Sequence, residues 1–434
     1  MLDLKITPQR EALIRGYDNE FFALLQVTSA EPRQKKETEN NLNLAIVIDK
    51  SGSMAGAPLE EAKRCAIMMI EKMHPSDRIA IVAYDNESEL IAPSSFCSDK
   101  QRMISLINSI REGGTTALHA GWLMGAEEVA KFKTEKSINR VLLLSDGNAN
   151  HGLTEVTEIK NQCAQLADVG VTTSTYGLGF SFNEELMIEM ASSGLGQGYY
   201  GETADDLSDP FQEEFALLLN TLGTNVKLRF ASPDFVKIEL MNSFRQNEHD
   251  WSMPDIASEG EGWALFKLKI KKEHVSDNPI ELLTCWVKYK NTEGEEKECK
   301  PVKLILDPLH PNAFSAIEEN EKVKARSSEL IVSQYQNKAT EAARLENWVE
   351  VDRLIIEAKL IAKDNPWMQA SLTSLEEYSR RRQTMQFSKA AIYSSDRMNK
   401  RLVSKDELDT HYDVSFEAKK ASYLRRKTER GKRM

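Results

Sequence analysis

Between about residues 42 and 223, short apolar runs alternate with amphipathic stretches of helical spacing. One of the runs, Val141–Leu144, is apolar at every position. Runs of this kind are typical of strands that are covered by helices on both faces of a parallel sheet. The sequence therefore predicts one doubly wound, Rossmann-like α/β domain over residues 41–224.

The elements of this domain can be assigned from the same pattern. The expected strands are Leu42–Asp49, Arg78–Tyr84, Arg140–Ser145, Thr172–Leu178 and Gly198–Tyr200. The expected helices are Leu59–Met73, Lys100–Ile110, Ala117–Phe132, Glu155–Val169, Glu184–Ala191 and Leu207–Leu222. A further run, Ser88–Ala92, follows Tyr84 after a short polar turn. We expect this run to pair antiparallel with its predecessor at the edge of the sheet.

Strand-like runs also lie on both sides of the α/β domain. After the domain they are Asn225–Phe230, Val236–Leu240, Gly262–Ile270, Glu281–Tyr289 and Lys300–Leu306, and before it Leu2–Thr7 and Phe21–Thr28. The two N-terminal strands have no local partners with which to pair. We therefore expect residues 1–40 to join a β-sandwich formed by residues 225–310, which makes the α/β domain an insertion in that sandwich.

The remainder of the chain is expected to be helical and then basic. Residues 311–400 form a predicted helical domain with helices at Ala313–Asn337, Ala339–Asp364 and Met368–Ile392. Residues 401–434 carry many Lys and Arg side chains. Such a run is typical of a solvated, flexible tail, and it is also suited to an acidic partner or surface.

Composition narrows the class of protein. The net charge of −11 argues against nucleic acid as the main partner. The N-terminus has no basic region followed by an apolar core, and no apolar run reaches the ~20 residues that span a bilayer. The five cysteines are odd in number and lack paired spacing, as in a reduced protein. We therefore expect a cytoplasmic protein without a transmembrane segment.

The first apolar strand of the α/β domain ends in a cluster of oxygen donors. Asp49, Ser51 and Ser53 alternate with Lys50 and Gly52 directly after this strand. Alternate spacing can bring the three donors to one side of a tight loop, and hard oxygen donors suit Mg²⁺, Mn²⁺ or Ca²⁺. Taken alone, the same residues would also fit a helix cap or a nucleophile loop.

Two further groups of oxygen donors follow where this fold would bring them close to Asp49. Asp146 comes directly after the strand Arg140–Ser145, and the loop Gly113-Gly-Thr-Thr116 precedes the helix expected from Ala117. In an open parallel sheet, ligands bind beyond the carboxyl ends of the strands, near the point where the strand order reverses. The three groups therefore predict one cation site.

These residues resemble the metal-ion-dependent adhesion site of von Willebrand factor type A domains. In that family the motif is Asp-x-Ser-x-Ser, then a Thr, then an Asp, and the corresponding residues are Asp49, Ser51, Ser53, Thr115 and Asp146. Thr115 is preferred to Thr116 because the family's threonine usually follows a glycine. The flanking strands resemble bacterial proteins similar to inter-α-trypsin-inhibitor heavy chains and calcium-activated chloride channel homologues.

The resemblance implies a role for each ligand. Ser51, Ser53 and Thr115 would contact Mg²⁺ directly, with Mn²⁺ or Ca²⁺ as alternatives, and Asp49 and Asp146 would hold it partly through water. The cation would then stay electrophilic and accept an Asp or Glu side chain of a partner protein. The resemblance thus implies a metal-dependent protein-binding module that acts as an adaptor in a larger assembly.

Two other functions are compatible with parts of the sequence. Type A domains of this kind often partner AAA+ ATPases, so the chain could be an adaptor subunit of a chaperone-like ATPase complex. A Mg²⁺-dependent phosphohydrolase is the enzymatic alternative. Haloacid-dehalogenase-like phosphatases need a second Asp at the position of Ser51, and the phosphate-binding motif Gly-x4-Gly-Lys-Ser/Thr is absent. We therefore expect a protein that is not an enzyme.

Overall fold

The structure is a computed structural model, and it describes residues 2–29, 41–146, 149–179, 182–201, 206–258, 260–275, 277–363, 365–400 and 403–404. Residues 30–40, which connect the N-terminal strands to the α/β segment, and nearly all of the basic tail lie outside these residues. The chain forms two compact units. One unit contains the N-terminal strands, the strands after Leu222 and the C-terminal helices, and the other is the α/β segment between them.

The α/β unit contains a six-stranded sheet with the order β6-β5-β4-β7-β8-β9. Its strands are β4 (Asn41–Asp49), β5 (Arg78–Tyr84), β6 (Ser88–Phe96), β7 (Ser137–Ser145), β8 (Thr172–Leu178) and β9 (Leu195–Gly201). All neighbours are parallel except β6, which pairs antiparallel with β5 at the edge. The predicted fold class of this segment is confirmed.

Helices follow the strands of this sheet and cover its faces. They are α1 (Ala57–Lys72), α2 (Lys100–Ser109), α3 (Leu118–Lys131), α4 (Val156–Asp168), α5 (Glu184–Ser193) and α6 (Ser208–Asn220). Apolar side chains of α1, α2 and α6 share one core with alternate residues of β4, such as Leu44 and Ile46. The intervening residue Val47 lies under α3, where Gly125 approaches it. Each central strand is therefore buried on both sides, which explains its continuous apolar sequence.

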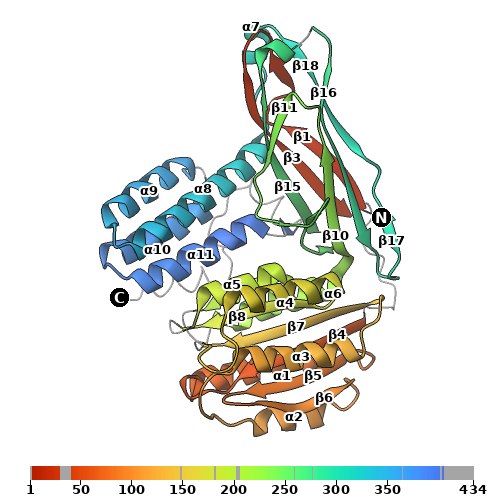
Figure 1. The fold of residues 1–434 in the computed structure, drawn as a ribbon, viewed down its shortest axis with the longest axis vertical. Coiled ribbons are helices and arrows are strands. Elements are labelled where there is room, and N and C mark those ends of the chain that lie inside the picture. Colours follow the sequence, from red (N-terminus) through yellow and green to blue (C-terminus); the bar gives the residue numbers. More distant parts are fainter. Residues whose placement is uncertain are drawn as a thin grey trace. The chain divides into compact units, whose positions relative to one another are not determined.

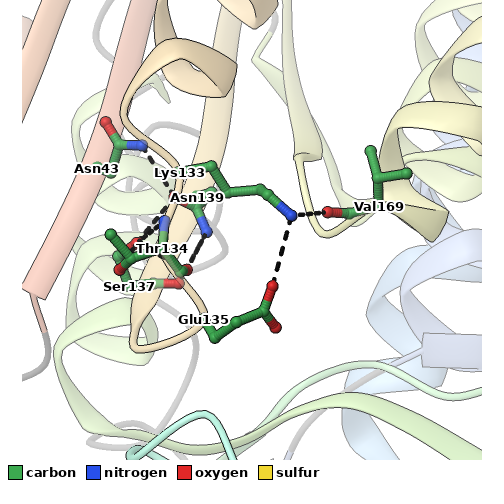
Figure 2. Close-up of polar contacts among 7 residues, drawn as sticks. All are labelled: Asn43, Lys133, Thr134, Glu135, Ser137, Asn139 and Val169. Atoms are coloured by element: carbon green, nitrogen blue, oxygen red, sulfur yellow. Dashed lines mark hydrogen bonds and ion pairs between the residues drawn. The ribbon is translucent and has the colours of Figure 1, made fainter.

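A polar network closes the end of the sheet where β4 and β7 begin (Figure 2). Asn43 donates to Asn139 Oδ1 at 2.8 Å, and Asn139 donates to the carbonyl of Thr134 in the turn before β7. Lys133 donates to the carbonyl of Val169 at the C-terminus of α4, where a cation also complements the helix dipole. This network fixes the turn between α3 and β7.

The N-terminal strands belong to a sheet whose other members come from after the α/β unit. This sheet contains β1 (Leu2–Pro8), β3 (Asn19–Ser29), β15 (Gly260–Ile270), β11 (Val236–Leu240) and the short β19 (Val403–Ser404). Figure 1 shows the red strands β1 and β3 beside the green β15. Because β3 pairs with β15 along its whole length, the α/β segment is inserted between two parts of one sheet. This is the predicted arrangement.

A second sheet packs on the first through a shared apolar core. Its strands are β2 (Ala12–Ile14), β10 (Thr221–Ala231), β12 (Arg245–Gln246), β13 (Trp251–Ser252), β14 (Ile256–Ala257), β16 (Ile280–Lys290), β17 (Glu296–Glu298) and β18 (Val302–Leu309). Phe266 of β15 and Val287 of β16 are among the buried residues of that core. The sequence does not predict β2 or the short strands, because runs of two or three residues carry too little alternation to be recognised.

The helical region consists of α7 (Pro311–Ser315), α8 (Glu321–Arg344), α9 (Trp348–Ile361), α10 (Pro366–Arg380) and α11 (Thr384–Lys400). The predicted boundaries here are wrong in three places. Residues 316–320 separate α7 from α8, α8 continues to Arg344, and the expected third helix is divided into α10 and α11. The breaks after α8 and after α10 are each made by a non-glycine residue with positive φ, Glu346 at 55° and Arg382 at 54°. Backbone N–H groups at these positions return to the last turn in a Schellman pattern, as from Asn347 to the carbonyl of Ala342. A glycine usually marks such an end, so the sequence carried no signal.

Two observations concern membrane-spanning helices and the state of the cysteines. In the described part of the chain, no helix has the length and apolar character needed to cross a bilayer. All five cysteines are free and buried, including Cys285 and Cys299. Burial raises the pKa of the Cys65 thiol to about 12, which keeps it protonated and unreactive at neutral pH.

Candidate metal centre

The sheet brings the two predicted aspartates to one edge. Asp49 is the last residue of β4, and Asp146 follows Ser145, the last residue of β7. Strand β4 lies between β5 and β7, so the chain leaves it toward one side and later returns on the other. This is the point at which the strand order reverses and where ligands bind in open α/β sheets.

Asp49 lies at the base of the site with both carboxylate oxygens engaged. Its Oδ1 accepts the backbone N–H of Ser51 at 2.9 Å, and its Oδ2 accepts the hydroxyl of Ser145 at 2.6 Å. The residue is 0% exposed. Both donors are uncharged, so they orient the carboxylate without neutralising its negative charge.

Ser51, Ser53 and Asp146 are also brought together. The Ser51 and Ser53 hydroxyl oxygens lie 3.2 Å apart, and the Ser53 hydroxyl donates to Asp146 Oδ1 at 2.8 Å. A hydroxyl that gives its proton to a carboxylate keeps its lone pairs for another partner. Ser51 is buried and Ser53 is exposed, so the group extends from the base of the site to its rim.

The electrostatics of these residues fit a divalent cation. Burial raises the pKa of Asp49, although the bonds from Ser145 and Ser51 oppose the shift. Burial, with a further contribution from the charge of Asp49, raises the pKa of Asp146 to about 6. Two buried carboxylates with raised pKa values lack a nearby positive charge that would stabilise their ionised forms. Hydroxyl and carboxylate oxygens are hard ligands, which suit a hard divalent cation. The residues present would therefore hold Mg²⁺, Mn²⁺ or Ca²⁺.

The glycine-containing loop packs directly on the loop after β4. Gly52 N–H donates to the carbonyl of Gly114 at 2.9 Å, and Gly113 N–H donates to the carbonyl of Lys50 at 2.7 Å. A Cβ atom on Gly113 would lie 1.8 Å from Asp85 Oδ2, and one on Gly114 would lie 2.4 Å from Asn86 Oδ1. A side chain at either position would therefore force Asp85 or Asn86 to move.

Asp85 and Asn86, which follow β5, clamp this loop in place. Asp85 Oδ2 accepts the N–H of Gly114 at 3.3 Å and pairs with Lys50 Nζ at 3.2 Å. Burial alone would raise the pKa of Asp85, but the bonds from Glu87 N–H, Lys50 and Gly114 lower it overall. The sequence motif does not include Asp85 or Asn86. Their position directly after the strand beside β4 is the signal that could have identified them.

The two threonines of the loop have different surroundings. Thr115 is exposed, and both its N–H and its hydroxyl donate to Asn86 Oδ1 at 2.5 Å. Thr116 is only 3% exposed, and its N–H and carbonyl both bond to Asn150, beyond Asp146. Within the described residues the Thr116 hydroxyl makes no hydrogen bond. The structure thus groups Asp49, Ser51, Ser53 and Asp146, whereas the Thr115 hydroxyl bonds to Asn86.

Comparison with known proteins agrees with the fold. A model of the von Willebrand factor type A domain family matches residues 43–213. The chain is similar to YfbK of Escherichia coli, with 26% identity over 361 residues that cover 76% of this chain and 62% of YfbK. It is also similar to human inter-alpha-trypsin inhibitor heavy chain H3, with 24% identity over 378 residues that cover 74% of this chain and 40% of the heavy chain. The chain thus spans less than two thirds of these relatives.

Solved structures reproduce the whole architecture. A von Willebrand factor type A protein from Catenulispora acidiphila has a TM-score of 0.69 at 14% identity, covering 92% of this chain and 96% of its own. The ArnB paralog VWA2 from Sulfolobus acidocaldarius has a TM-score of 0.63 at 15% identity, covering 91% and 97%. At these identities the likeness concerns the fold alone.

An α/β sheet with two aspartates and two serines gathered at its strand-order reversal defines a class of cation-site domain. The inserted segment is a von Willebrand factor type A domain, and the chain is a homologue of YfbK and of the inter-alpha-trypsin inhibitor heavy chains. The predicted family membership is confirmed.

Proposed function

We propose that this protein is a metal-dependent protein-binding module and that its type A domain captures an acidic side chain of a partner protein. A divalent cation bound at the site would supply a positive centre that accepts a carboxylate oxygen. The residues of the chain hold and shape that centre. Asp49 and Asp146 supply negative charge, Ser51 and Ser53 supply hydroxyl oxygens, and Lys50, Asp85 and Asn86 fix the loops.

The main support for the proposal is the placement of Asp49 and Asp146. Two carboxylates with raised pKa values converge on the serine hydroxyls, and the outermost of these residues, Ser53, is exposed. A purely structural pair of buried carboxylates would be expected to have a basic side chain between them. The nearby Lys50 instead pairs with Asp85 and Glu89. The arrangement is therefore suited to an added cation that is reached from solvent.

We propose Thr116 as the threonine donor of the site. The motif in the sequence favours Thr115, and that choice stays a prediction. In the structure the Thr115 hydroxyl donates to Asn86. Thr116 is buried, its backbone bonds to Asn150 beyond Asp146, and its hydroxyl makes no hydrogen bond among the described residues. We infer that Thr115 anchors the loop through Asn86 and that the Thr116 hydroxyl is the donor to the cation.

Binding rather than catalysis is proposed for this site. The carboxylates are held by neutral donors, and Ser51 occupies the place where a phosphatase of the haloacid-dehalogenase type would need its second Asp. An adaptor role in an AAA+ ATPase complex also remains a prediction from the resemblance.

An array of immobilised peptides tests the proposal directly. Each peptide with a central Asp or Glu would be matched with the same peptide carrying Asn or Gln. We expect the wild-type protein to bind a subset of the acidic peptides in Mg²⁺ or Mn²⁺ and to lose them in chelator. The Asp49→Asn variant should bind none of this subset. Acidic and amide peptides that bind equally, or binding that survives the chelator, would contradict carboxylate capture.

A further inference from the structure

Helix α9 carries an exposed apolar stripe. Leu345 is 81% exposed, Val349 83%, Ile356 61% and Leu360 70%. We call these four residues the α9 stripe. Val349, Ile356 and Leu360 recur at spacings of seven and four, which places them on one face of the helix. Leu345 lies four residues before Val349, in the turn that leads into the helix.

The α9 stripe is distinct from the face of α9 that packs in the helical region. That inner face consists of Val351, Leu354, Ile355 and Ala358, all of which are buried. The inner face meets α8 and α10, and in Figure 1 α9 lies on the outer side of α8. A surface helix normally has one apolar face and one polar face. An additional apolar stripe therefore indicates an interaction surface.

The α9 stripe is arranged symmetrically along the chain. Leu345 and Leu360 lie at equal sequence distances from the point between Asp352 and Arg353, and Val349 and Ile356 do so as well. When two copies of α9 pair antiparallel about a two-fold axis at that point, Val349 of each copy meets Ile356 of the other. Leu345 lies outside the helix and flanks this contact. A two-fold interface requires this self-complementarity.

The charged residues along the stripe agree with the same pairing. In the antiparallel arrangement Asp352 of one copy lies opposite Arg353 of the other. A parallel pairing would place Arg353 opposite Arg353 and Asp352 opposite Asp352. Within its own helix Arg353 is held by Glu350 and Glu357, and Asp352 accepts the Ser379 hydroxyl at 2.5 Å, so the two side chains are preordered.

We propose that the protein forms a homodimer through antiparallel pairing of α9 with α9 of a second copy. The α9 stripe is the apolar centre of the interface, and Asp352 and Arg353 lie at its two-fold axis. Each dimer then carries two type A domains, and a partner with two acidic segments would be bound more tightly than by one copy alone.

Sedimentation equilibrium of the full-length chain over a range of concentrations tests dimerisation. We expect the mass to approach twice 49.1 kDa. Ile356→Glu should weaken the dimer at least tenfold, because it buries two like charges beside the two-fold axis. The matched control is Ile305→Glu, which alters an apolar residue of β18 that is 52% exposed and should leave the dimer intact. Circular dichroism would verify that both variants are folded.

Cysteine cross-linking tests the register of the pairing. In an antiparallel pair the two Val349 positions lie about 10 Å apart along the helix axis, because they are separated by seven residues at ~1.5 Å each. A disulfide requires Cα atoms within about 7 Å. A mixture of Val349→Cys and Ile356→Cys chains should therefore cross-link on oxidation, and either variant alone should not. The native cysteines are buried and should not interfere.

Three results would overturn the proposal. The first is a monomer at every concentration, as expected if the α9 stripe is covered by residues 405–434 or by a different protein. The second is a dimer that Ile356→Glu leaves unchanged, which would locate the interface elsewhere. The third is cross-linking of Val349→Cys alone that equals the mixture, which would exclude the antiparallel register.

Discussion

The Ser53 hydroxyl donates a 2.8 Å hydrogen bond to Asp146, although the two residues are 93 positions apart in sequence. The bond joins the loop after β4 to the end of β7 across the strand-order reversal of the sheet. Because Ser53 donates its proton to Asp146, its oxygen retains lone-pair density that a cation bound at this edge would accept.

Replacement of Asp146 should raise the stability of the metal-free protein and abolish its stabilisation by metal. Since its pKa is raised from 3.8 to about 6 in the folded protein, the metal-free folded state binds a proton more tightly than the unfolded chain between these pH values. Stability of the metal-free protein should therefore fall as pH rises through this window and level off above it. The loss is on the order of 3 kcal/mol for a shift of this size.

Asp146→Asn removes that titration. Urea denaturation of the metal-free variant should show higher stability than wild type at pH 7 and a flatter pH dependence between pH 4 and 7. Added Mg²⁺ should stabilise only the wild type. A variant that is less stable than wild type without metal, with an unchanged pH profile, would contradict the raised pKa assigned to Asp146.

Asn86→Ala should weaken cation binding without unfolding the domain. The change removes the acceptor for both the N–H and the hydroxyl of Thr115, so the loop that faces Gly52 is held less firmly. Residues that orient metal ligands typically contribute about 10- to 100-fold in affinity. Asn108→Ala, at an exposed position of α2, is the control and should bind like wild type. Equal affinity in both variants would show that the clamp is dispensable.

The two threonines provide a separate prediction. Thr116→Ala should reduce cation affinity more than Thr115→Ala, because the Thr115 hydroxyl is already bonded to Asn86. Thr116→Ser keeps the hydroxyl and should restore most of the affinity. Calorimetric titration of the three variants with Mn²⁺ would measure this order. The reverse order would support the choice of Thr115 made from the sequence.

Much of this site could be predicted from the sequence because its residues follow strands. Asp49 and Asp146 stand directly after continuous apolar runs, and the carboxyl ends of parallel strands meet at one edge. Lys50, Asp85 and Asn86 were not identified, since their role depends on which loop packs against which. The distinction between Thr115 and Thr116 has the same origin, because a side chain's partners are set by tertiary contacts.

The fold was predicted well where periodicity is strong and less well where a helix ends without glycine. Strand β5 begins and ends where the sequence indicates. The turns at Glu346 and Arg382 were not predicted, because both residues adopt a left-handed conformation that favours glycine. Tertiary packing of the neighbouring helices stabilises these turns, and a local pattern does not report it.

Glu214→Ala should strongly destabilise the type A domain. Glu214 of α6 is fully buried and accepts bonds from Arg140 at 2.6 Å, from Ser174 at 2.8 Å and from Tyr199 at 2.8 Å. Its removal leaves the Arg140 guanidinium buried without its carboxylate, which typically costs about 3–5 kcal/mol.

Glu281→Ala is the matched control, because it removes an exposed ion pair with Lys303. Exposed pairs of this kind contribute little to stability, because water and salt screen them. Urea denaturation would compare the two variants with wild type. Similar free energies of unfolding for both would show that α6 is not anchored by Glu214.

The most direct test of the central claim is calorimetric titration of Mg²⁺ and Mn²⁺ into the metal-free wild type and into Asp49→Asn. Asp49 is fully buried and is held by Ser51 and Ser145, so the substitution removes one negative charge from the base of the site with little change in shape. We predict one saturable site per chain in the wild type and its loss in a variant that remains folded. Equal binding of the cation by both proteins would contradict the assignment of this site.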